Sequence, residues 1–265
     1  MVMLAQADIN TEEVLSWQGL HLLHFVGSSC SQKTRIFLKL KGIDCELHHV
    51  DLRSRENYSD WFLGINPRGL VPVLVDNGQV IIESNDILLY LEEKYPEPPL
   101  LPSPSDAVAK AALDAEDNLH LDLRALSMRF VFSVERSMRS EEVLQQYEAG
   151  GTGTVGGAPD GHRQTELKFF RDMISNNGIP DEQVRTSVNR FRGAYSDLEA
   201  KLDDTQYLLG PDISVLDIAW YIYSVRLLAA GYPLHQLHPH VGNWFDALHS
   251  REVFRSEVMA PPPPE

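Results

Sequence analysis

The chain has 265 residues, of which 43% are hydrophobic and 23% are charged, a composition typical of a folded protein and unlike that of a disordered one. It carries 23 Lys and Arg residues against 38 Asp and Glu residues, so its formal net charge is −15. Nucleic acids and anionic membrane surfaces would repel such a chain, and the charge therefore excludes both as broad binding partners.

Three further features predict a cytoplasmic location. No apolar run approaches the roughly 20 residues that a membrane-spanning helix needs. The first residues lead into Asp8, Glu12 and Glu13 without the basic region of a signal peptide. The two cysteines, Cys30 and Cys45, are too few for a disulfide framework or a four-cysteine zinc site.

The first third of the chain alternates between strand and helix patterns. Residues 1–19 are polar with scattered apolar positions, and we expect an extension packed on the surface. Gly42 is placed to end a helix in the left-handed conformation, and Asn77-Gly78 is the signal of a tight hairpin. The patterns predict strands at 20–25, 45–50, 71–75 and 80–82, and helices at 33–41, at 58–63 and from Ser84 through Leu91.

The composition changes at residues 96–104, where five prolines predict a linker. Beyond this linker we find only helical patterns, one of them an apolar stripe of Leu119, Leu123, Leu126 and Phe130. The sequence therefore predicts an N-terminal extension at 1–19, an α/β domain at 20–97, an all-helical domain at 105–255 and a Pro-rich tail at 256–265.

Two segments of the second half could suggest binding sites but do not support them. The glycine-rich residues 150–161 lack the Gly-Lys-Ser/Thr ending of a phosphate-binding loop, so they predict a flexible connection. The histidines of 234–240 have no accompanying cysteine or carboxylate, so they predict a loop between helices, and we expect no metal site.

Two short motifs in the α/β domain point together to a peptide-like ligand. In Val71-Pro72, a proline that opens a strand suits a cis peptide bond, which would turn the Val71 backbone outward to pair with another extended chain. Glu83-Ser84 at a helix start suits an α-amino-acid head group, with its ammonium on Glu83 and its carboxylate on Ser84 and the helix terminus. Taken singly, the motifs are an ordinary turn proline and an ordinary helix cap.

The segment Asn66-Pro67-Arg68-Gly69-Leu70-Val71-Pro72, followed by Glu83-Ser84 and a helix ending in Tyr-Leu, resembles the signature of the cytosolic glutathione transferases. The resemblance runs from about Leu20 onward, and Ser214 to Asp217 resembles the capping box of that family's helical domain. It implies the glutathione transferase fold, in which an α/β thioredoxin-like N-terminal domain binds glutathione as cosubstrate and an all-α C-terminal domain supplies the acceptor pocket. It also implies a homodimer or a related two-subunit assembly. We expect glutathione as the cosubstrate and no metal cofactor.

This family keeps its thiol-activating residue just after the first strand. Counting back from Gly42, Ser28 occupies the position where serine-type classes keep a hydroxyl. A serine O–H that donates to the glutathione sulfur, together with the positive end of a helix, would stabilise the thiolate over the thiol. The alternatives are that Ser28 only caps the helix and that Ser29, Ser31 or Cys30 contacts the thiol.

Cys30 keeps a second activity open. A cysteine at a helix N-terminus can have a lowered pKa and form a mixed disulfide with glutathione, which is thiol-transfer chemistry. Two other interpretations are a non-catalytic relative that binds glutathione or hydrophobic ligands, and a scaffold module that uses the fold for assembly. Around the site, one or more of Arg53, Arg55 and Arg68 could pair with the glycyl carboxylate of glutathione, solvated surface charge being the alternative.

The acceptor side is predicted from a narrower resemblance. Ser59 to Phe62, Ile65 to Gly69 and the long stretch 140–181 resemble the bacterial β-etherases and the related fungal etherase-type transferases. This implies displacement of an aryl-ether oxygen by glutathione in lignin-derived aromatics. On the helix of the apolar stripe, Arg124, Met128 and Arg129 are predicted to contact an aromatic substrate, the alternative being core packing and solvated charge.

Overall fold

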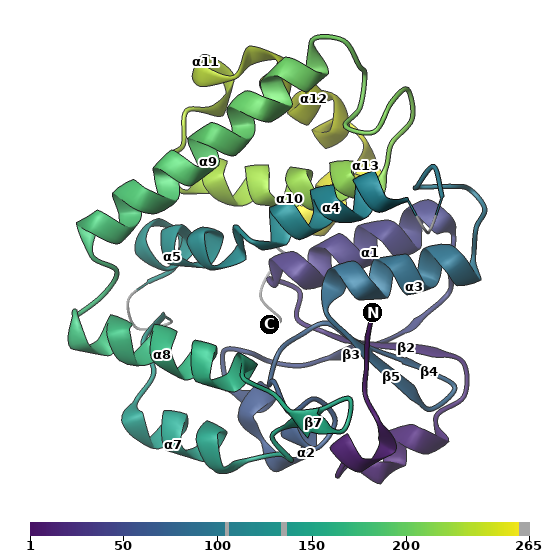
Figure 1. Ribbon diagram of the computed structural model, residues 1–265, viewed down its shortest axis with the longest axis vertical. Coiled ribbons are helices and arrows are strands. Elements are labelled where there is room, and N and C mark those ends of the chain that lie inside the picture. Colours follow the sequence, from purple (N-terminus) through teal and green to yellow (C-terminus); the bar gives the residue numbers. More distant parts are fainter. Residues whose placement is uncertain (104–105, 134–136, 260–265) are drawn as a thin grey trace. The chain divides into compact units, whose positions relative to one another are not determined.

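The computed structural model describes residues 1–103, 106–133 and 137–259. The chain divides into two compact units that do not follow chain order (Figure 1). The first unit contains residues 1–34, 42–90 and 138–178, and the second contains residues 35–41, 91–137 and those from Ile179 onward. The domain boundaries derived from the sequence stay predictions.

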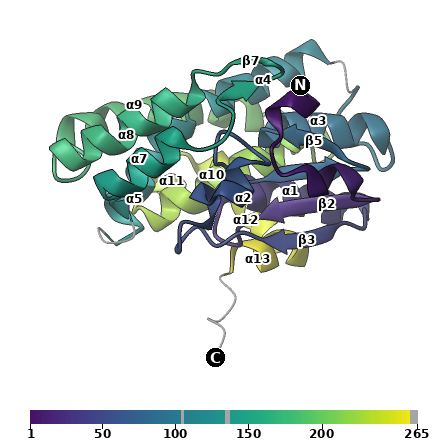
Figure 2. The same ribbon diagram turned by 90° about the horizontal axis from the view of Figure 1, so that it is seen from below.

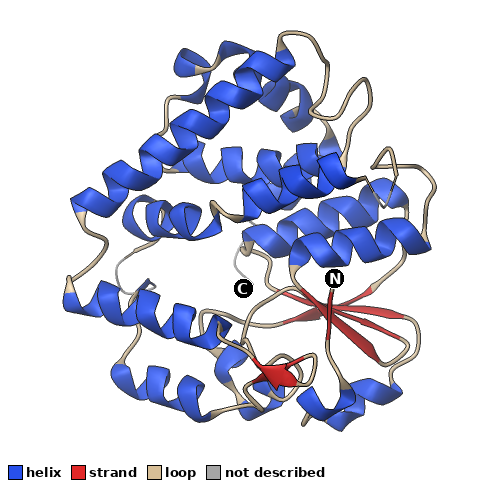
Figure 3. Cartoon of the chain, in the orientation of Figure 1, coloured by secondary structure: helices blue, strands red, loops and turns tan. Residues whose placement is uncertain are grey.

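The first unit is built around a five-stranded mixed sheet in the order β1-β5-β4-β2-β3 (Figure 3, red). Strand β2 pairs in parallel with β3, whereas the β2–β4, β4–β5 and β5–β1 pairs are antiparallel. All four residues of β4 are buried, as expected of a strand with neighbours on both sides. The bounds are β1 (Val2–Met3), β2 (Leu20–His24), β3 (Glu46–His49), β4 (Val73–Asp76) and β5 (Gln79–Ile82).

The turns that the sequence predicts are present. Gly42 follows the helix α1 (Ser29–Lys41) with φ of 63°. Asn77 and Gly78 join β4 to β5 with φ of 48° and 82°, the positive pair that a two-residue hairpin turn of type I′ needs. Helix α1 begins at Ser29, earlier than the predicted Lys33, so the serines that follow β2 lie at its first turn.

Residues 1–19 do more than pack on the surface, which corrects the prediction for this segment. Val2 and Met3 form β1 and pair with Ile82 and Ile81 of β5. The backbone N–H of Val2 also donates to Asp86 Oδ2 at 2.7 Å in helix α3 (Ser84–Lys94). Short 3-10 turns follow at Gln6–Asp8 and Glu12–Ser16. The extension therefore supplies one edge strand of the sheet.

The prediction of a flexible connection at 150–161, with no strand beyond residue 104, is wrong. The segment contains a hairpin of β6 (Thr154–Val155) and β7 (Ala158–Pro159), whose turn glycines, Gly156 and Gly157, have φ of 64° and 77°. Asp8, fully buried in the extension, accepts hydrogen bonds from Thr154 Oγ1 at 2.7 Å and from the Gly157 N–H at 3.1 Å. These contacts dock the hairpin on the N-terminal extension.

Besides the sheet, the first unit contains three further helices, α2 (Asp60–Leu63), α7 (Glu141–Ala149) and α8 (His162–Ser175), and a 3-10 turn at Glu56–Tyr58. The second unit contains α4 (Ala107–Asp117), α5 (His120–Phe130), α9 (Asp181–Leu202), α10 (Val215–Ala229), α11 (Leu234–Leu237), α12 (Pro239–His249) and α13 (Glu252–Val258). None of the described helices is long and apolar enough to cross a membrane.

The core of the second unit includes α10, most of whose side chains are buried. Ser214 accepts from the Asp217 N–H while Asp217 accepts from the Ser214 N–H, so the predicted capping box is present. In the stripe predicted for α5, Leu119, Leu123 and Leu126 are buried. Phe130, the last residue of α5, is 50% exposed, so the buried stripe ends at Leu126 and not at Phe130.

Candidate functional site

The predicted glutathione-binding motifs lie at one end of the sheet, where three of its central strands begin or end. Leu23 of β2 pairs with Val73 of β4, and Val73 pairs with Ile82 of β5. The carboxyl ends of β2 and β5 and the amino end of β4 therefore lie side by side. Ser28, Val71-Pro72 and Glu83-Ser84 adjoin these three strand ends, so the structure brings together motifs that are distant in sequence.

The Val71–Pro72 peptide bond is cis, as the sequence analysis anticipated. The Val71 N–H makes no hydrogen bond to any of the described residues. Before it, Gly69 has φ of 64°, and a Cβ there would lie 3.0 Å from the Tyr147 ring and 3.2 Å from the Asn57 carbonyl oxygen. Glycine is thus required in the turn that leads to this peptide bond.

Ser28 caps helix α1. Its Oγ accepts from the Ser31 N–H at 3.3 Å and its carbonyl accepts from the Gln32 N–H at 2.8 Å. A hydroxyl has one donor hydrogen besides its acceptor lone pairs, so a capping serine can still donate to a sulfur. Ser31 is fully buried, with its Oγ 3.4 Å from the Phe25 N–H. Of the serines considered, Ser28 thus combines partial exposure with a cap at the helix terminus.

The two cysteines lie in different settings. Cys30 is half-buried in the first turn of α1. Cys45 precedes β3, and its burial, reinforced by the charges of Glu46 and Asp76, raises the pKa of its thiol to about 12. Cys45 is therefore a poor thiolate source, and Cys30 is the cysteine to consider for thiol chemistry.

Glu83 belongs to a charged network with Arg68 and Asp160. Glu83 has φ of 69°, and its Oε1 accepts from Arg68 Nη1 at 2.5 Å. The Arg68 Nε and Nη2 atoms donate to the two oxygens of Asp160 at 2.9 and 2.8 Å, a bidentate pair. The Arg68 side chain is 13% exposed. Arg68 therefore holds two carboxylates, and its pairing with the glycyl carboxylate of glutathione stays a prediction.

The electrostatics agree with this pairing. Burial alone would lower the pKa of Arg68, but the hydrogen bonds and charges of Asp160 and Glu83 raise it. Burial would likewise raise the pKa of Asp160, and Arg68 holds it below its ordinary value. Asp160 was missed in the sequence because it follows β7 with no motif around it, and its partner lies 92 residues earlier.

The loop that carries Arg68 is fixed by α7 and α8. Tyr147 donates from its hydroxyl to the Arg68 carbonyl at 2.7 Å, and Arg163 Nη2 donates to the Pro67 carbonyl at 2.8 Å. The 138–178 segment, which contains both helices, thus supports the turn before Val71 as well as supplying Asp160.

The two other arginines differ in their surroundings. Arg55 donates to the carbonyls of Leu52 and Met138 at 3.0 and 3.2 Å, and burial together with the charge of Arg139 lowers its pKa. Arg53 is exposed, and its guanidinium lies 5.7 Å from the centre of the Phe25 ring, just beyond the end of β2. Of the three arginines considered, Arg53 is thus the exposed one, and a role for any of them at glutathione stays a prediction.

The predicted acceptor residues belong to α5 in the second unit. Arg129 donates to the Ile179 carbonyl at 3.1 Å and to Asp181 Oδ1 at 3.0 Å, at the start of α9. Met128 and Arg124 are half-buried, and Arg129 is exposed. The contacts of Arg129 have a structural purpose, since they tie α5 to α9. The role of the three residues in substrate binding stays a prediction.

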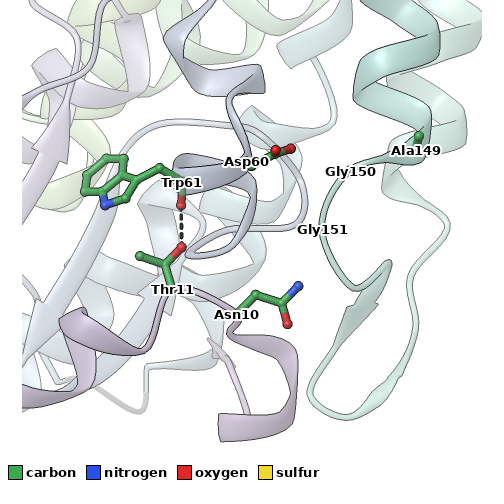
Figure 4. A pocket seen from close by; sticks show the side chains of 7 residues that line it. All are labelled: Asn10, Thr11, Asp60, Trp61, Ala149, Gly150 and Gly151. Atoms are coloured by element: carbon green, nitrogen blue, oxygen red, sulfur yellow. Dashed lines mark hydrogen bonds between the residues drawn. The ribbon is translucent and has the colours of Figure 1, made fainter.

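A cleft of about 530 Å³ in the first unit does not coincide with the predicted site (Figure 4). Two of its lining residues are joined by a hydrogen bond, which Thr11 Oγ1 donates to the Trp61 carbonyl at 2.7 Å. The cleft is lined by Asn10, Thr11, Asp60, Trp61, Ala149, Gly150 and Gly151. It is formed by the extension, α2 and the end of α7, and it contains none of the residues predicted to bind glutathione.

Comparison with known proteins supplies the family context. Residues 22–99 match the family described as "Glutathione S-transferase, N-terminal domain". A zeta-class glutathione S-transferase of Euphorbia esula is 52% identical over 84 residues, 32% of this chain and 37% of that protein. Maleylpyruvate isomerase of Ralstonia is 42% identical over 87 residues, 33% of this chain and 41% of that protein. These two matches thus span about two fifths of the relatives.

One relative matches over nearly its whole length. Protein LigF of Sphingobium sp. strain SYK-6 is 26% identical over 247 residues, 89% of this chain and 91% of that protein. The crystal structure of β-etherase LigF from this strain superposes with a TM-score of 0.71 at 24% identity, covering 91% of this chain and 98% of that one. The likeness shows that the two chains share a fold.

Proposed function

We propose that the protein is a glutathione transferase with a serine-type site, because residues 22–99 match the glutathione S-transferase N-terminal domain family and 91% of the chain superposes on the fold of LigF. The proposal depends on one observation. The strand register brings the segments of Ser28, Val71-Pro72 and Glu83-Ser84 to the same end of the sheet. Each supplies what one part of glutathione needs.

In this proposal Ser28 and the start of α1 stabilise the glutathione thiolate. The Ser28 hydroxyl donates to the sulfur, and the α1 N-terminus adds its positive end. Lowering a thiol pKa from about 8.5 by about two units requires roughly 2.7 kcal/mol. One charge-assisted hydrogen bond and one helix terminus together supply that amount.

The peptide part of glutathione is held by groups on both sides of Ser28. The second carboxylate oxygen of Glu83 accepts from the γ-glutamyl ammonium, while Ser84 and the α3 terminus bind the α-carboxylate. The Val71 backbone pairs with the cysteinyl residue of the ligand. Arg53 pairs with the glycyl carboxylate, which is the anionic end furthest from Glu83. Asp160 and Arg68 act as positioning residues that hold Glu83.

For the electrophile we propose an aromatic molecule with an aryl-ether bond. The glutathione thiolate attacks the carbon that bears the ether oxygen, a C–S bond forms, the C–O bond breaks, and the phenolate leaves and takes a proton from water. The similarity to LigF supports this choice because it extends over 89% of the chain and so includes the helices that would form the acceptor pocket. Arg124, Met128 and Arg129 are the residues proposed to contact the substrate.

A glutathione-dependent isomerase is the second candidate. The 42% identity to maleylpyruvate isomerase favours it, but that match covers only 33% of the chain, the part proposed to bind glutathione. In such a reaction the thiolate would add to an activated double bond and leave again after rotation, so glutathione would not be consumed. We further propose a two-subunit assembly and a cytoplasmic location, in keeping with the resemblance to cytosolic glutathione transferases and with two unbridged cysteines.

Turnover with glutathione separates these activities. The purified chain is incubated with an aryl ether, an aryl halide, a cis-configured unsaturated diacid and a disulfide substrate, and products are identified by mass spectrometry. We expect a glutathione conjugate and a released phenol. Isomerised diacid without glutathione loss would establish the isomerase, glutathione disulfide formation that needs Cys30 would establish thiol transfer, and binding without turnover would establish a non-catalytic relative.

A further inference from the structure

Three chemistry-bearing side chains gather at the opposite end of the sheet from the candidate functional site. They are His21 on β2 and Glu46 and His48 on β3. β2 and β3 lie side by side, with His21 opposite Glu46 and Leu23 opposite His48 (Figure 2). Because side chains alternate along a strand, residues 46 and 48 share one face with His21. The register of the two strands therefore creates the cluster.

The potential ligand atoms have the spacing of a metal site. His21 Nδ1 lies 3.0 Å from His48 Nε2 and 3.4 Å from Glu46 Oε2. His48 Nε2 lies 3.6 Å from Glu46 Oε1. In tetrahedral zinc sites with bonds of about 2.0–2.1 Å, neighbouring ligands are about 3.3–3.4 Å apart. The two imidazole nitrogens each face a different oxygen of the Glu46 carboxylate, and one ligand atom from each of the three residues lies within 4.8 Å of the others, so a small shift of the exposed Glu46 side chain brings them to this spacing.

The surroundings orient the two imidazole rings. His21 Nε2 lies 2.9 Å from the Gln18 carbonyl oxygen, which can only accept, so Nε2 carries the hydrogen and Nδ1 presents its lone pair to the cluster. Metal-binding histidines have this second hydrogen bond to a carbonyl or carboxylate. Trp17 stacks on His48 with ring centroids 4.6 Å apart and an angle of 19°. Both rings are therefore held before any ion arrives.

We propose that His21, Glu46 and His48 bind one zinc ion, with water as the fourth ligand. Two imidazoles and a carboxylate suit zinc better than magnesium or calcium, which prefer oxygen ligands alone. Without the ion, His48 Nε2–H donates to His21 Nδ1; with it, the His48 proton moves to Nδ1 of the same ring. The Glu46 side chain is 66% exposed, so the ion would have access from solvent and would tie the edge strand β3 to β2.

The test is direct zinc binding by the full chain. After treatment with a chelator, the protein is titrated with ZnCl2 in a calorimeter, and native mass spectrometry gives the stoichiometry. We expect one zinc per chain and no binding of Mg²⁺ at the same concentration. Co²⁺ should give the visible absorption of a four-coordinate site, which zinc should then abolish.

Variants decide whether the ion occupies this cluster. His48→Ala and Glu46→Gln should each weaken zinc affinity at least tenfold, and Glu46→Gln changes an exposed side chain that folding does not need. His49→Ala is the matched control, because His49 is the next residue of β3 and points to the other face. The proposal is overturned if no zinc binds, if Glu46→Gln and His48→Ala bind as tightly as the unaltered chain, or if His49→Ala loses binding equally.

Discussion

Asp160→Asn tests the network that holds Glu83. The change removes the negative charge from the bidentate pair with Arg68 and keeps the shape of the side chain. The Arg68 and Asp160 side chains are only 13% and 17% exposed, so water compensates little for the lost charge. Hydrogen bonds to charged groups contribute about 1.5–3 kcal/mol. We expect the free energy of unfolding to fall by about that amount.

The assay is urea unfolding of the full chain at neutral pH, followed by circular dichroism. Asp172→Asn is the matched control, because Asp172 pairs with Lys168 at the surface, where both side chains are more than half exposed. An exposed pair contributes at most about 1 kcal/mol, so this variant should stay close to the unaltered chain. Equal stability of Asp160→Asn and the unaltered chain would show that the Asp160–Arg68 pair does not stabilise the fold.

The pH dependence gives a second readout of the same pair. Because the pKa of Asp160 is lower in the folded chain, its stabilising effect is present above the unfolded value, near 3.8, and is lost as the pH falls through the folded value. The difference between Asp160→Asn and the unaltered chain should therefore shrink in strong acid. A difference that persists unchanged below that range would point to lost packing and not to lost charge.

Three further substitutions test other parts of the structure. Ser28→Ala should lower turnover by roughly one to three powers of ten with nearly unchanged glutathione affinity, measured by steady-state kinetics, and loss on Ser29→Ala or Ser31→Ala alone would move the role along the loop. Glu83→Gln should weaken glutathione binding by about 1.5–3 kcal/mol in calorimetry, and unchanged binding would remove Glu83 from the site. Asp8→Asn should destabilise the chain by about 1–3 kcal/mol near neutral pH. Burial acts to raise the pKa of Asp8, but hydrogen bonds from Thr154 and from backbone amides lower it below its ordinary value of 3.8. The stability difference between Asp8→Asn and the unaltered chain should therefore disappear as the pH falls below about 3.8. Thermal melts at several pH values measure this difference.

Local chemistry explains which elements could be predicted from the sequence. Asn77-Gly78 and Gly42 were predictable because their positive φ angles follow from the residues themselves. The strand β1 was not, because two residues carry no periodic pattern and Val2 becomes a strand only through its pairing with Ile82. The hairpin at 154–159 likewise depends on Asp8, a partner more than a hundred residues earlier.

The residues of the candidate site also differ in whether the sequence alone could identify them. Val71-Pro72 and Glu83-Ser84 form short contiguous motifs, so they could be recognised without a structure. Asp160 could not, because nothing near it in sequence indicates that it meets Arg68. Arg53 and Arg55 could not be distinguished from the sequence. Arg55 donates a hydrogen bond to the carbonyl of Met138, which lies far along the chain.

The pairing of β1 with β5 has a consequence for how the chain tolerates shortening. Besides the β1 register, the Leu4 N–H donates to the Val80 carbonyl at 3.0 Å, so residues 2–4 cover one side of β5. Removing them would leave Val80, Ile81 and Ile82 on an uncovered sheet edge with unpaired backbone groups. Such an edge recruits strands from other molecules. A chain trimmed by a protease at its first residues should therefore self-associate before it unfolds.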